Sequence, residues 1–152
     1  MAYIYFDYKN EEVQTGNYVI RTVLKQLLLP LDWVPFSLET VYDDCHSHSR
    51  TPDRVVLVQQ LLSVAAAFSS VYVMLDALDE SSRGTLEDTI TLINQFKNSG
   101  IKVFCTFRPI LDALGDRLGV PIIHSISAYD ADVRNYLSIR LNKEWRHNKQ
   151  FL

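Results

Sequence analysis

Short apolar runs alternate along this chain with longer segments in which apolar residues recur every three or four positions. The runs are rich in aromatic and β-branched residues and predict strands at 2–8, 71–76, 101–106 and 120–126. The segments with helical spacing predict helices at 16–29, 52–68, 86–98, 110–118 and 130–141. Because strands and helices alternate, we expect a parallel sheet with right-handed crossovers. The pattern therefore predicts an α/β fold in three layers.

Residues at the predicted helix ends agree with these boundaries. Thr15 is a capping residue for the first helix, and Pro30 ends it because proline cannot donate the next backbone hydrogen bond. Pro52 suits the first turn of the second helix, and Asp130 is a capping residue for the last one. The stretch 31–50 is rich in aspartate and serine and contains a proline, so we expect it to be mostly loop.

The second predicted strand ends in an acidic sequence. It runs through apolar residues to Asp76, and Asp79 and Glu80 follow three and four positions later. In parallel α/β sheets, functional residues gather at the carboxyl ends of the strands. Magnesium takes one or two carboxylates together with phosphate and water, and a second acid nearby can polarise the attacking water. The sequence thus predicts a magnesium ligand at Asp76; the alternative is an acidic loop that only caps the next helix.

An arginine follows the end of the next predicted strand. Arg108 comes two residues after the strand at 101–106, and parallel strand ends meet at one edge of the sheet. A guanidinium there can reach a terminal phosphate and stabilise the charge that develops during its transfer. The alternative is an ordinary ion pair with Asp79, Glu80 or Asp112.

Five segments around these residues resemble a known family. They are 3–8, 24–28, 71–80, 103–109 and 130–137. The segment 71–80 is an apolar strand followed by Asp76, Asp79 and Glu80, which is the extended Walker B pattern. Together the segments are similar to the nephrocystin-type NACHT domains of the STAND NTPases, found in long fungal proteins. The resemblance covers residues 2–141, so we expect a partial NACHT domain at 1–141 and a polar, frayed tail at 142–152.

The resemblance implies a nucleotide-driven switch that binds ATP or GTP with magnesium. By match to the family, Asp76 would hold the magnesium ion through water. Asp79 or Glu80 would activate the attacking water, and Arg108 would be the sensor arginine. Members of the family often carry ankyrin or similar repeats after the NTPase domain, and such repeats would be partners of this region.

The chain departs from the family at the phosphate-binding loop. None of its five glycines belongs to a Gly-x4-Gly-Lys-Ser/Thr sequence, so the cradle of backbone amides and its lysine are absent. The strand that precedes this loop in the family is absent too; there it lies between the strands that match 101–106 and 120–126. We therefore expect an incomplete P-loop fold that does not hydrolyse nucleotide alone. Ala77 and Phe107 also replace the usual glycine and serine.

Two functions remain open at this point. The chain is either a partial nucleotide-binding module whose P-loop lies on a missing N-terminal segment, or a non-catalytic interaction domain derived from such a module. In both cases an unpaired sheet edge invites another chain, so self-association is possible. The missing P-loop segment and downstream repeat domains are the expected partners.

Composition narrows the range of expected partners and the expected cellular compartment. The net charge is −3 and no basic block occurs, so we expect neither nucleic acid nor an anionic membrane as a partner. Cys45 and Cys105 do not form a disulfide framework, and no targeting or membrane-spanning segment stands out, so we expect a cytoplasmic protein. The sequence Cys45-His46-Ser47-His48 lacks a fourth metal ligand and is expected to be a solvated loop.

Overall fold

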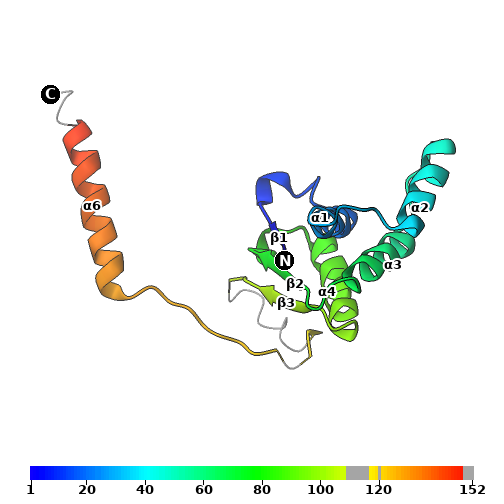
Figure 1. The fold of residues 1–152 in the computed structure, drawn as a ribbon. Coiled ribbons are helices and arrows are strands. Elements are labelled where there is room, and N and C mark those ends of the chain that lie inside the picture. Colours follow the sequence, from blue (N-terminus) through cyan, green and yellow to red (C-terminus); the bar gives the residue numbers. More distant parts are fainter. Residues whose placement is uncertain (109–116, 120, 149–152) are drawn as a thin grey trace. The chain divides into compact units, whose positions relative to one another are not determined.

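The computed structural model of the protein describes residues 1–108, 117–119 and 121–148 (Figure 1). The chain divides into two compact units, Met1–Val120 and Pro121–Leu152, and each is described by itself. Among the described helices, none combines the length and apolar composition that a membrane-spanning helix requires.

The first unit is built on a parallel sheet of three strands in the order β1-β2-β3. The strands are β1 (Ala2–Tyr5), β2 (Tyr72–Asp76) and β3 (Lys102–Cys105). In register, Leu75 lies opposite Ile4 on one side and Cys105 on the other. The strand that ends in Asp76 is therefore central, and the α/β fold class with a parallel sheet is confirmed.

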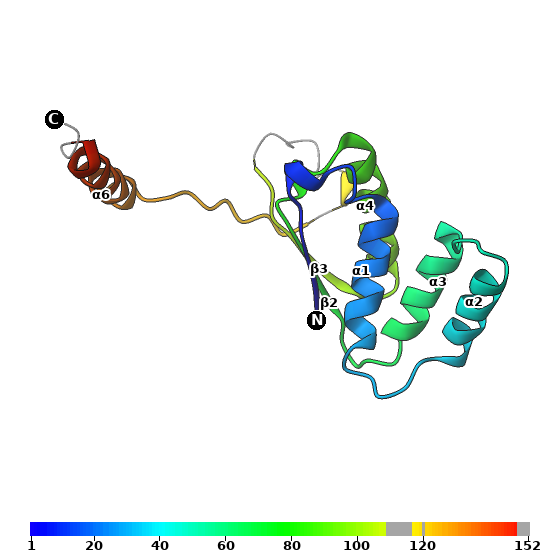
Figure 2. The same ribbon diagram turned by 90° about the horizontal axis from the view of Figure 1, so that it is seen from above.

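Helices cover one face of this sheet (Figure 2). Helices α1 (Gly16–Leu28) and α4 (Arg83–Asn98) lie against the strands, and α3 (Arg54–Ala65) packs on α1. Helix α1 packs on β1, and α4 also packs against α1. The strand residues that point to the helices are buried, and they join the helices in one apolar core that includes Ile4, Val73, Leu75, Ile20, Leu61 and Phe96. Burial of these side chains is the main stabilisation of the fold.

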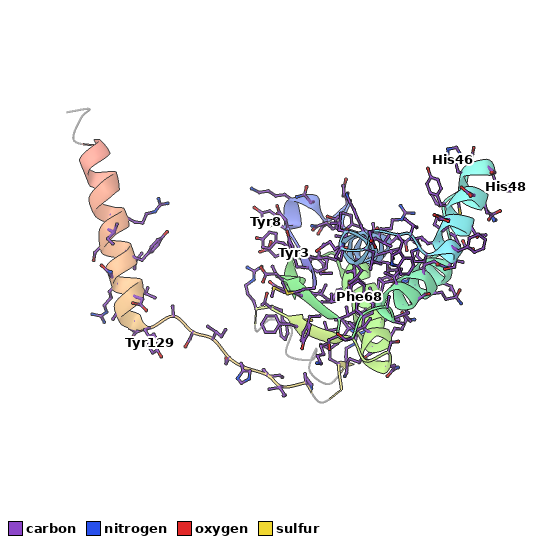
Figure 3. The ribbon with its side chains drawn as sticks, in the orientation of Figure 1. Tyr3, Tyr8, His46, His48, Phe68 and Tyr129 are labelled. Carbon is purple, nitrogen blue, oxygen red and sulfur yellow. The ribbon has the colours of Figure 1, made fainter. Side chains whose placement is uncertain are left out.

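The other face of the sheet is exposed. Five apolar and aromatic side chains on it are between 37% and 62% accessible: Tyr3, Tyr5, Tyr72, Met74 and Phe104. We call these five residues the exposed sheet face. Exposed Lys102 lies on the same face and donates a hydrogen bond to the Tyr72 hydroxyl at 3.1 Å. Tyr3 lies on the side of β1 away from α1 (Figure 3). Parallel sheets are normally covered on both faces, yet within 1–108 the helices α1, α3 and α4 leave this one open.

The capping prediction for the first helix is confirmed. The hydroxyl of Thr15 accepts a hydrogen bond from the backbone N–H of Tyr18 at 3.3 Å. Helix α4 begins three residues earlier than predicted, because the Ser82 hydroxyl caps it by accepting from the backbone N–H of Thr85 at 3.2 Å. A serine cap satisfies one of the orphan donors of the first turn.

The prediction of a loop at 31–50 was wrong, because helix α2 spans Phe36–Ser47. The apolar residues of this helix do not form the regular stripe that marks a core helix, and none of its residues is fully buried. Ser37 donates a hydrogen bond to Gln60 of α3 at 2.9 Å, which ties α2 to the rest of the unit. Leu38 also packs against the core, so the contacts of α2 with the rest of the unit are few.

The prediction of a strand at 120–126 was also wrong where the structure describes it. Residues 121–129 form no strand, and Ile122, His124 and Ile126 are exposed. A strand needs a neighbouring ladder for its backbone groups, and none of the described strands pairs with residues 121–126. Most of the helix predicted at 110–118 lies outside the described residues.

The second unit contains helix α6, which spans Asp130–Asn148. It runs past residue 141, so the prediction of a frayed tail from 142 placed the helix end too early. Asp130 is helical rather than the cap; the carbonyl of Tyr129 accepts the first bonds, from the N–H groups of Asp132 and Val133 at 2.9 and 3.1 Å. The assignment of 1–141 to one partial domain stays a prediction.

Candidate functional site

The acidic sequence begins with a sharp turn after the central strand. β2 ends at Asp76, and Ala77 adopts the left-handed conformation, with φ 54° and ψ 46°. A short 3₁₀ helix, η2 (Leu78–Glu80), follows, and Leu78 is fully buried at its start. The turn therefore inserts Leu78 into the core and leaves Asp76, Asp79 and Glu80 at the carboxyl end of the sheet.

Asp76 is held by residues of both neighbouring strand ends. The Thr106 hydroxyl donates to Oδ1 of Asp76 and accepts from the backbone N–H of Ala77 at 2.9 Å. On the other side, the backbone N–H of Phe6 donates to the Asp76 carbonyl at 3.0 Å. Oδ2 of Asp76 accepts no hydrogen bond from the described residues, so one carboxylate oxygen remains for another ligand.

Thr106 is a residue of the candidate site that the sequence did not single out. Its hydroxyl bridges the carboxylate of Asp76 and the backbone of the turn, and its carbonyl accepts from the N–H of Leu78 at 2.9 Å. Its position directly after β3 was a usable signal, since strand ends meet at one edge of a parallel sheet.

Arg108 contacts the acidic residues of the turn. Its backbone N–H donates to Oδ1 of Asp79 at 3.0 Å, and its Nε donates to Oδ2. A guanidinium nitrogen also lies 3.7 Å from a carboxylate oxygen of Glu80. The Asp79 side chain is 7% exposed and that of Arg108 is 63% exposed. The structure thus brings Arg108 together with Asp79 and Glu80 as an ion pair; Asp112, the third acid considered, lies outside the described residues.

The pKa of Asp79 reflects two opposing effects. Burial of the carboxyl raises its pKa, but the hydrogen bonds from the Arg108 side chain and backbone outweigh this effect and hold the pKa below its ordinary value. Asp79 is therefore a carboxylate at neutral pH. Both carboxylate oxygens of Asp79 accept a hydrogen bond from Arg108.

These residues can contribute one part of a cation site. Magnesium is commonly held by one or two protein carboxylates, with phosphate and water completing its shell, and Asp76 with its unengaged Oδ2 fits that role. The described residues contain no group of three or more acidic, cysteine or histidine side chains that could bind a metal by themselves. The remaining ligands would have to come from a nucleotide and water.

Three further sequence features lie outside the acidic turn. Phe107 packs against the core rather than standing free beside Arg108. Cys105 is partly buried, and burial raises the pKa of its thiol to about 12, so it stays protonated at neutral pH. His46 and His48 lie at the exposed end of α2 (Figure 3), where His48 pairs with Asp44 at 3.3 Å.

Replacing Ala77 by glycine is expected to stabilise the protein. A residue with a β-carbon in the left-handed region costs about 1–2 kcal/mol, while glycine loses more chain entropy on folding. We therefore expect the variant A77G to raise the free energy of unfolding by about 0.5–1 kcal/mol, measured by urea denaturation. Replacement of Ala66, which caps α3 with φ −65°, by glycine is the control and should not stabilise.

The Asp79–Arg108 pair predicts a specific loss of stability in acid. Because the folded pKa of Asp79 is lowered, its contribution is complete above the unfolded value of about 4 and is lost as pH falls through the folded value. The variant Asp79→Asn should therefore lose less stability than the wild type between neutral pH and about pH 3. Urea denaturation at a series of pH values measures this slope; an equal slope in both proteins contradicts the assignment.

Comparison with known proteins identifies one family. The family model described as Nephrocystin 3, N-terminal matches residues 1–108, which contain the whole sheet, Asp76, the turn and Arg108. Neither the curated proteins nor the solved structures yield a match.

Proposed function

Because the chain belongs to the nephrocystin 3 N-terminal family, we propose that it is the acidic half of a NACHT-type nucleotide switch of the STAND class. In this proposal the chain binds magnesium and ATP or GTP only after a separate segment supplies the P-loop. It would work in the cytoplasm as part of a longer signalling protein of the fungal type that carries repeat domains.

The observation that carries the proposal is the arrangement at the end of β2. Asp76 lies on the central strand and is oriented by Thr106, and its Oδ2 accepts no hydrogen bond from the residues that the structure describes. Arg108 and the acids Asp79 and Glu80 lie next to it on adjoining turns. A cation ligand, a pair of acids and an arginine at one strand end are the groups that phosphoryl transfer requires beside a P-loop.

The residues would act in the following roles. Bound magnesium would neutralise charge on the phosphate oxygens, and Asp76 would hold it through water. Glu80, which Arg108 approaches only to 3.7 Å, or Asp79 would orient and deprotonate the attacking water. Arg108 would bind the terminal phosphate, and a phosphate that attracts this guanidinium would compete with Asp79 for it. Nucleotide would thereby break the Asp79–Arg108 pair, a local change suited to a switch.

The exposed sheet face is consistent with a further, complementing segment that covers it and completes the sheet. Its five apolar side chains and the outer edge of β3 are left uncovered by the elements of residues 1–108. A strand along β3 followed by a helix over this face would supply the missing ladder and cover. The sequence of this chain has no Gly-Lys-Ser/Thr loop of its own, so the complementing segment would also bring the phosphate-binding loop.

A non-catalytic interaction domain is the second candidate. The observation that favours it is the close pairing of Arg108 with Asp79, which resembles a structural ion pair. In that case the exposed sheet face would bind a partner and no nucleotide.

One complementation experiment separates the two functions. We would add a synthetic P-loop peptide, made of an apolar strand, the loop Gly-x4-Gly-Lys-Ser and an amphipathic helix, and measure binding of fluorescent ATP and GTP with magnesium. The proposal expects saturable binding that requires both the peptide and the chain and that is lost in the variant Asp76→Ala. Peptide binding without any nucleotide binding would contradict the proposal of a nucleotide switch and favour the non-catalytic interaction domain.

A further inference from the structure

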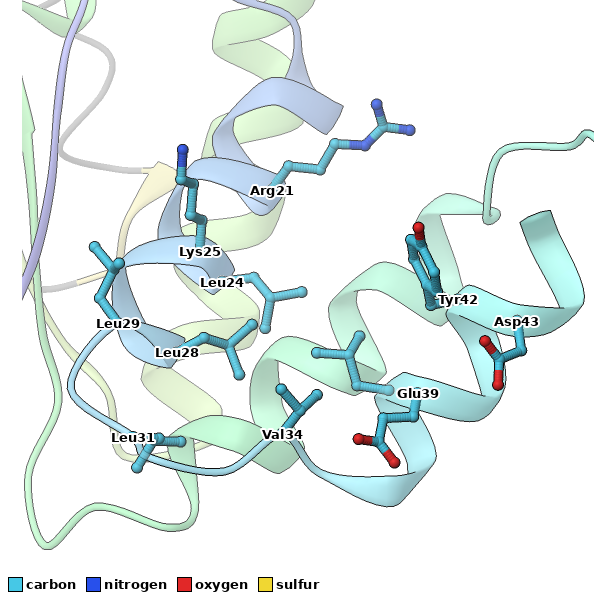
Figure 4. Close-up of a pocket in the computed structure, with 11 residues that line it drawn as sticks. Arg21, Leu24, Lys25, Leu28, Leu29, Leu31, Val34, Glu39, Tyr42 and Asp43 are labelled. Atoms are coloured by element: carbon cyan, nitrogen blue, oxygen red, sulfur yellow. The ribbon is translucent and has the colours of Figure 1, made fainter.

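A groove lies between α1 and α2, on the helical side of the first unit and remote in sequence from the strand-end site (Figure 4). Its volume is about 930 Å³, within the usual range for ligand-binding pockets. We call it the α1–α2 groove. Its apolar lining comes from both helices and the loop between them: Leu24, Leu28, Leu31, Val34, Leu38 and Tyr42.

The groove is an apolar surface that the described elements leave without cover. Val34 is 50% exposed and Tyr42 is 66% exposed, although both line it. Helix α2 buries no residue fully, so its wall of the groove contributes little to the core. Exposed apolar surface rimmed by charged residues is a common feature of interaction sites.

The two rims of the groove carry opposite charges. Arg21 and Lys25 lie one turn apart on α1, and Glu39 and Asp43 lie one turn apart on α2. None of these four side chains forms a salt bridge with another described residue. The α1 rim therefore attracts acidic groups and the α2 rim attracts basic ones.

From this charge pattern we propose that the α1–α2 groove binds an amphipathic helix of another protein, with acidic residues along one border of its apolar stripe and basic residues along the other. The like charges of each rim are spaced i, i+4, the spacing at which a bound helix presents its own border residues. Leucine-type anchors three and four positions apart would fill the apolar floor, as in other helix-in-groove complexes.

An extended peptide fits the groove less well. Both walls are helices whose backbone groups are already paired within α1 and α2, so a strand in the groove would find no backbone hydrogen-bond partner in either wall. A helix satisfies these groups internally and needs only side-chain contacts. The chemistry of the walls thus selects a helical ligand.

The test uses three fluorescein-labelled helical peptides that share one leucine stripe. The first has glutamate on one border and lysine on the other; the second has lysine on both; the third has glutamate on both. Fluorescence anisotropy with the full chain is expected to show about tenfold tighter binding of the mixed peptide, from two favourable ion pairs and no like-charge contacts. Equal affinities for all three, or no binding of any, would overturn the proposal.

Protein variants check that binding occurs in the groove. The double variant Arg21→Glu/Lys25→Glu makes both rims acidic and should prefer the lysine-bordered peptide. The variant Val34→Asp should weaken binding at least about tenfold, whereas the control Val13→Asp, at an exposed valine outside the groove, should not. Circular dichroism verifies that each variant is folded. A wild-type dimer in sedimentation that Val34→Asp dissociates would show that a second copy occupies the groove, contrary to the proposal.

Discussion

Replacing Phe96 by alanine is expected to lower the free energy of unfolding by about 3–5 kcal/mol, the usual cost of deleting a buried aromatic ring. Phe96 lies on α4 and is 0% exposed. Its ring belongs to the core cluster that joins the helices to the sheet, and a cavity there cannot collapse without moving packed neighbours. Urea denaturation followed by circular dichroism measures the change.

The matched control is the same substitution on the other side of the sheet. Phe104 lies on β3 in the exposed sheet face and is 57% exposed. Its replacement by alanine removes little buried surface, so we expect a cost of at most about 1 kcal/mol from reduced strand propensity. A loss as large as that of Phe96→Ala would mean that the exposed sheet face is covered in solution, against the structure described here.

The second large effect concerns the complementing segment. If the P-loop peptide covers the exposed sheet face, the double variant Met74→Lys/Phe104→Lys should reduce its affinity at least about 100-fold, because two apolar contacts are replaced by charges that must be desolvated. Isothermal calorimetry of the peptide against both proteins measures this difference. Both side chains are partly or largely exposed in the chain alone, at 37% and 57%, so the variant should fold.

One control variant tests whether the loss is specific to the sheet face. The variant Val55→Lys places a charge on α3, at a residue that is 67% exposed and lies away from the sheet face, and it should bind the peptide as the wild type does. If Met74→Lys/Phe104→Lys binds equally well, the segment does not dock on the sheet and the proposed completion of the fold is wrong.

The elements that pack into the core could be predicted from the sequence. The central strand is apolar from Val71 to Leu75, and the first and fourth helices carry an apolar stripe and a hydroxyl cap. These signals are local, so one sequence is enough to detect them. The predicted parallel orientation of the strands followed from their alternation with helices.

The elements that depend on distant neighbours could not be predicted in this way. Helix α2 has no buried stripe and is supported by contact with α3, so its spacing did not distinguish it from a loop. The run at 120–126 has strand-like composition, but strand formation needs a ladder, and no described strand pairs with residues 121–126. Composition describes the preference of a segment, whereas pairing decides its structure.

For the candidate site, the sequence predicted the place but not all the contacts. The ends of β2 and β3 had to meet, which placed Asp76, Asp79 and Arg108 together. The pairing of Arg108 with Asp79 rather than with another acid depends on side-chain geometry, which sequence spacing does not determine. The same holds for the hydrogen bond from Thr106 to Asp76. The roles of these residues in nucleotide chemistry stay predictions.

The central claim is that this chain carries the acidic part of a nucleotide site and lacks the part that binds phosphate. Its most direct test is calorimetric titration of ATP with magnesium into the chain alone, with the variant Asp76→Ala beside it. The account predicts no heat of binding for either protein, because no loop of backbone amides and lysine holds the phosphates. Saturable binding by the chain alone that disappears in Asp76→Ala would contradict it, since the strand end would then bind metal and nucleotide unaided.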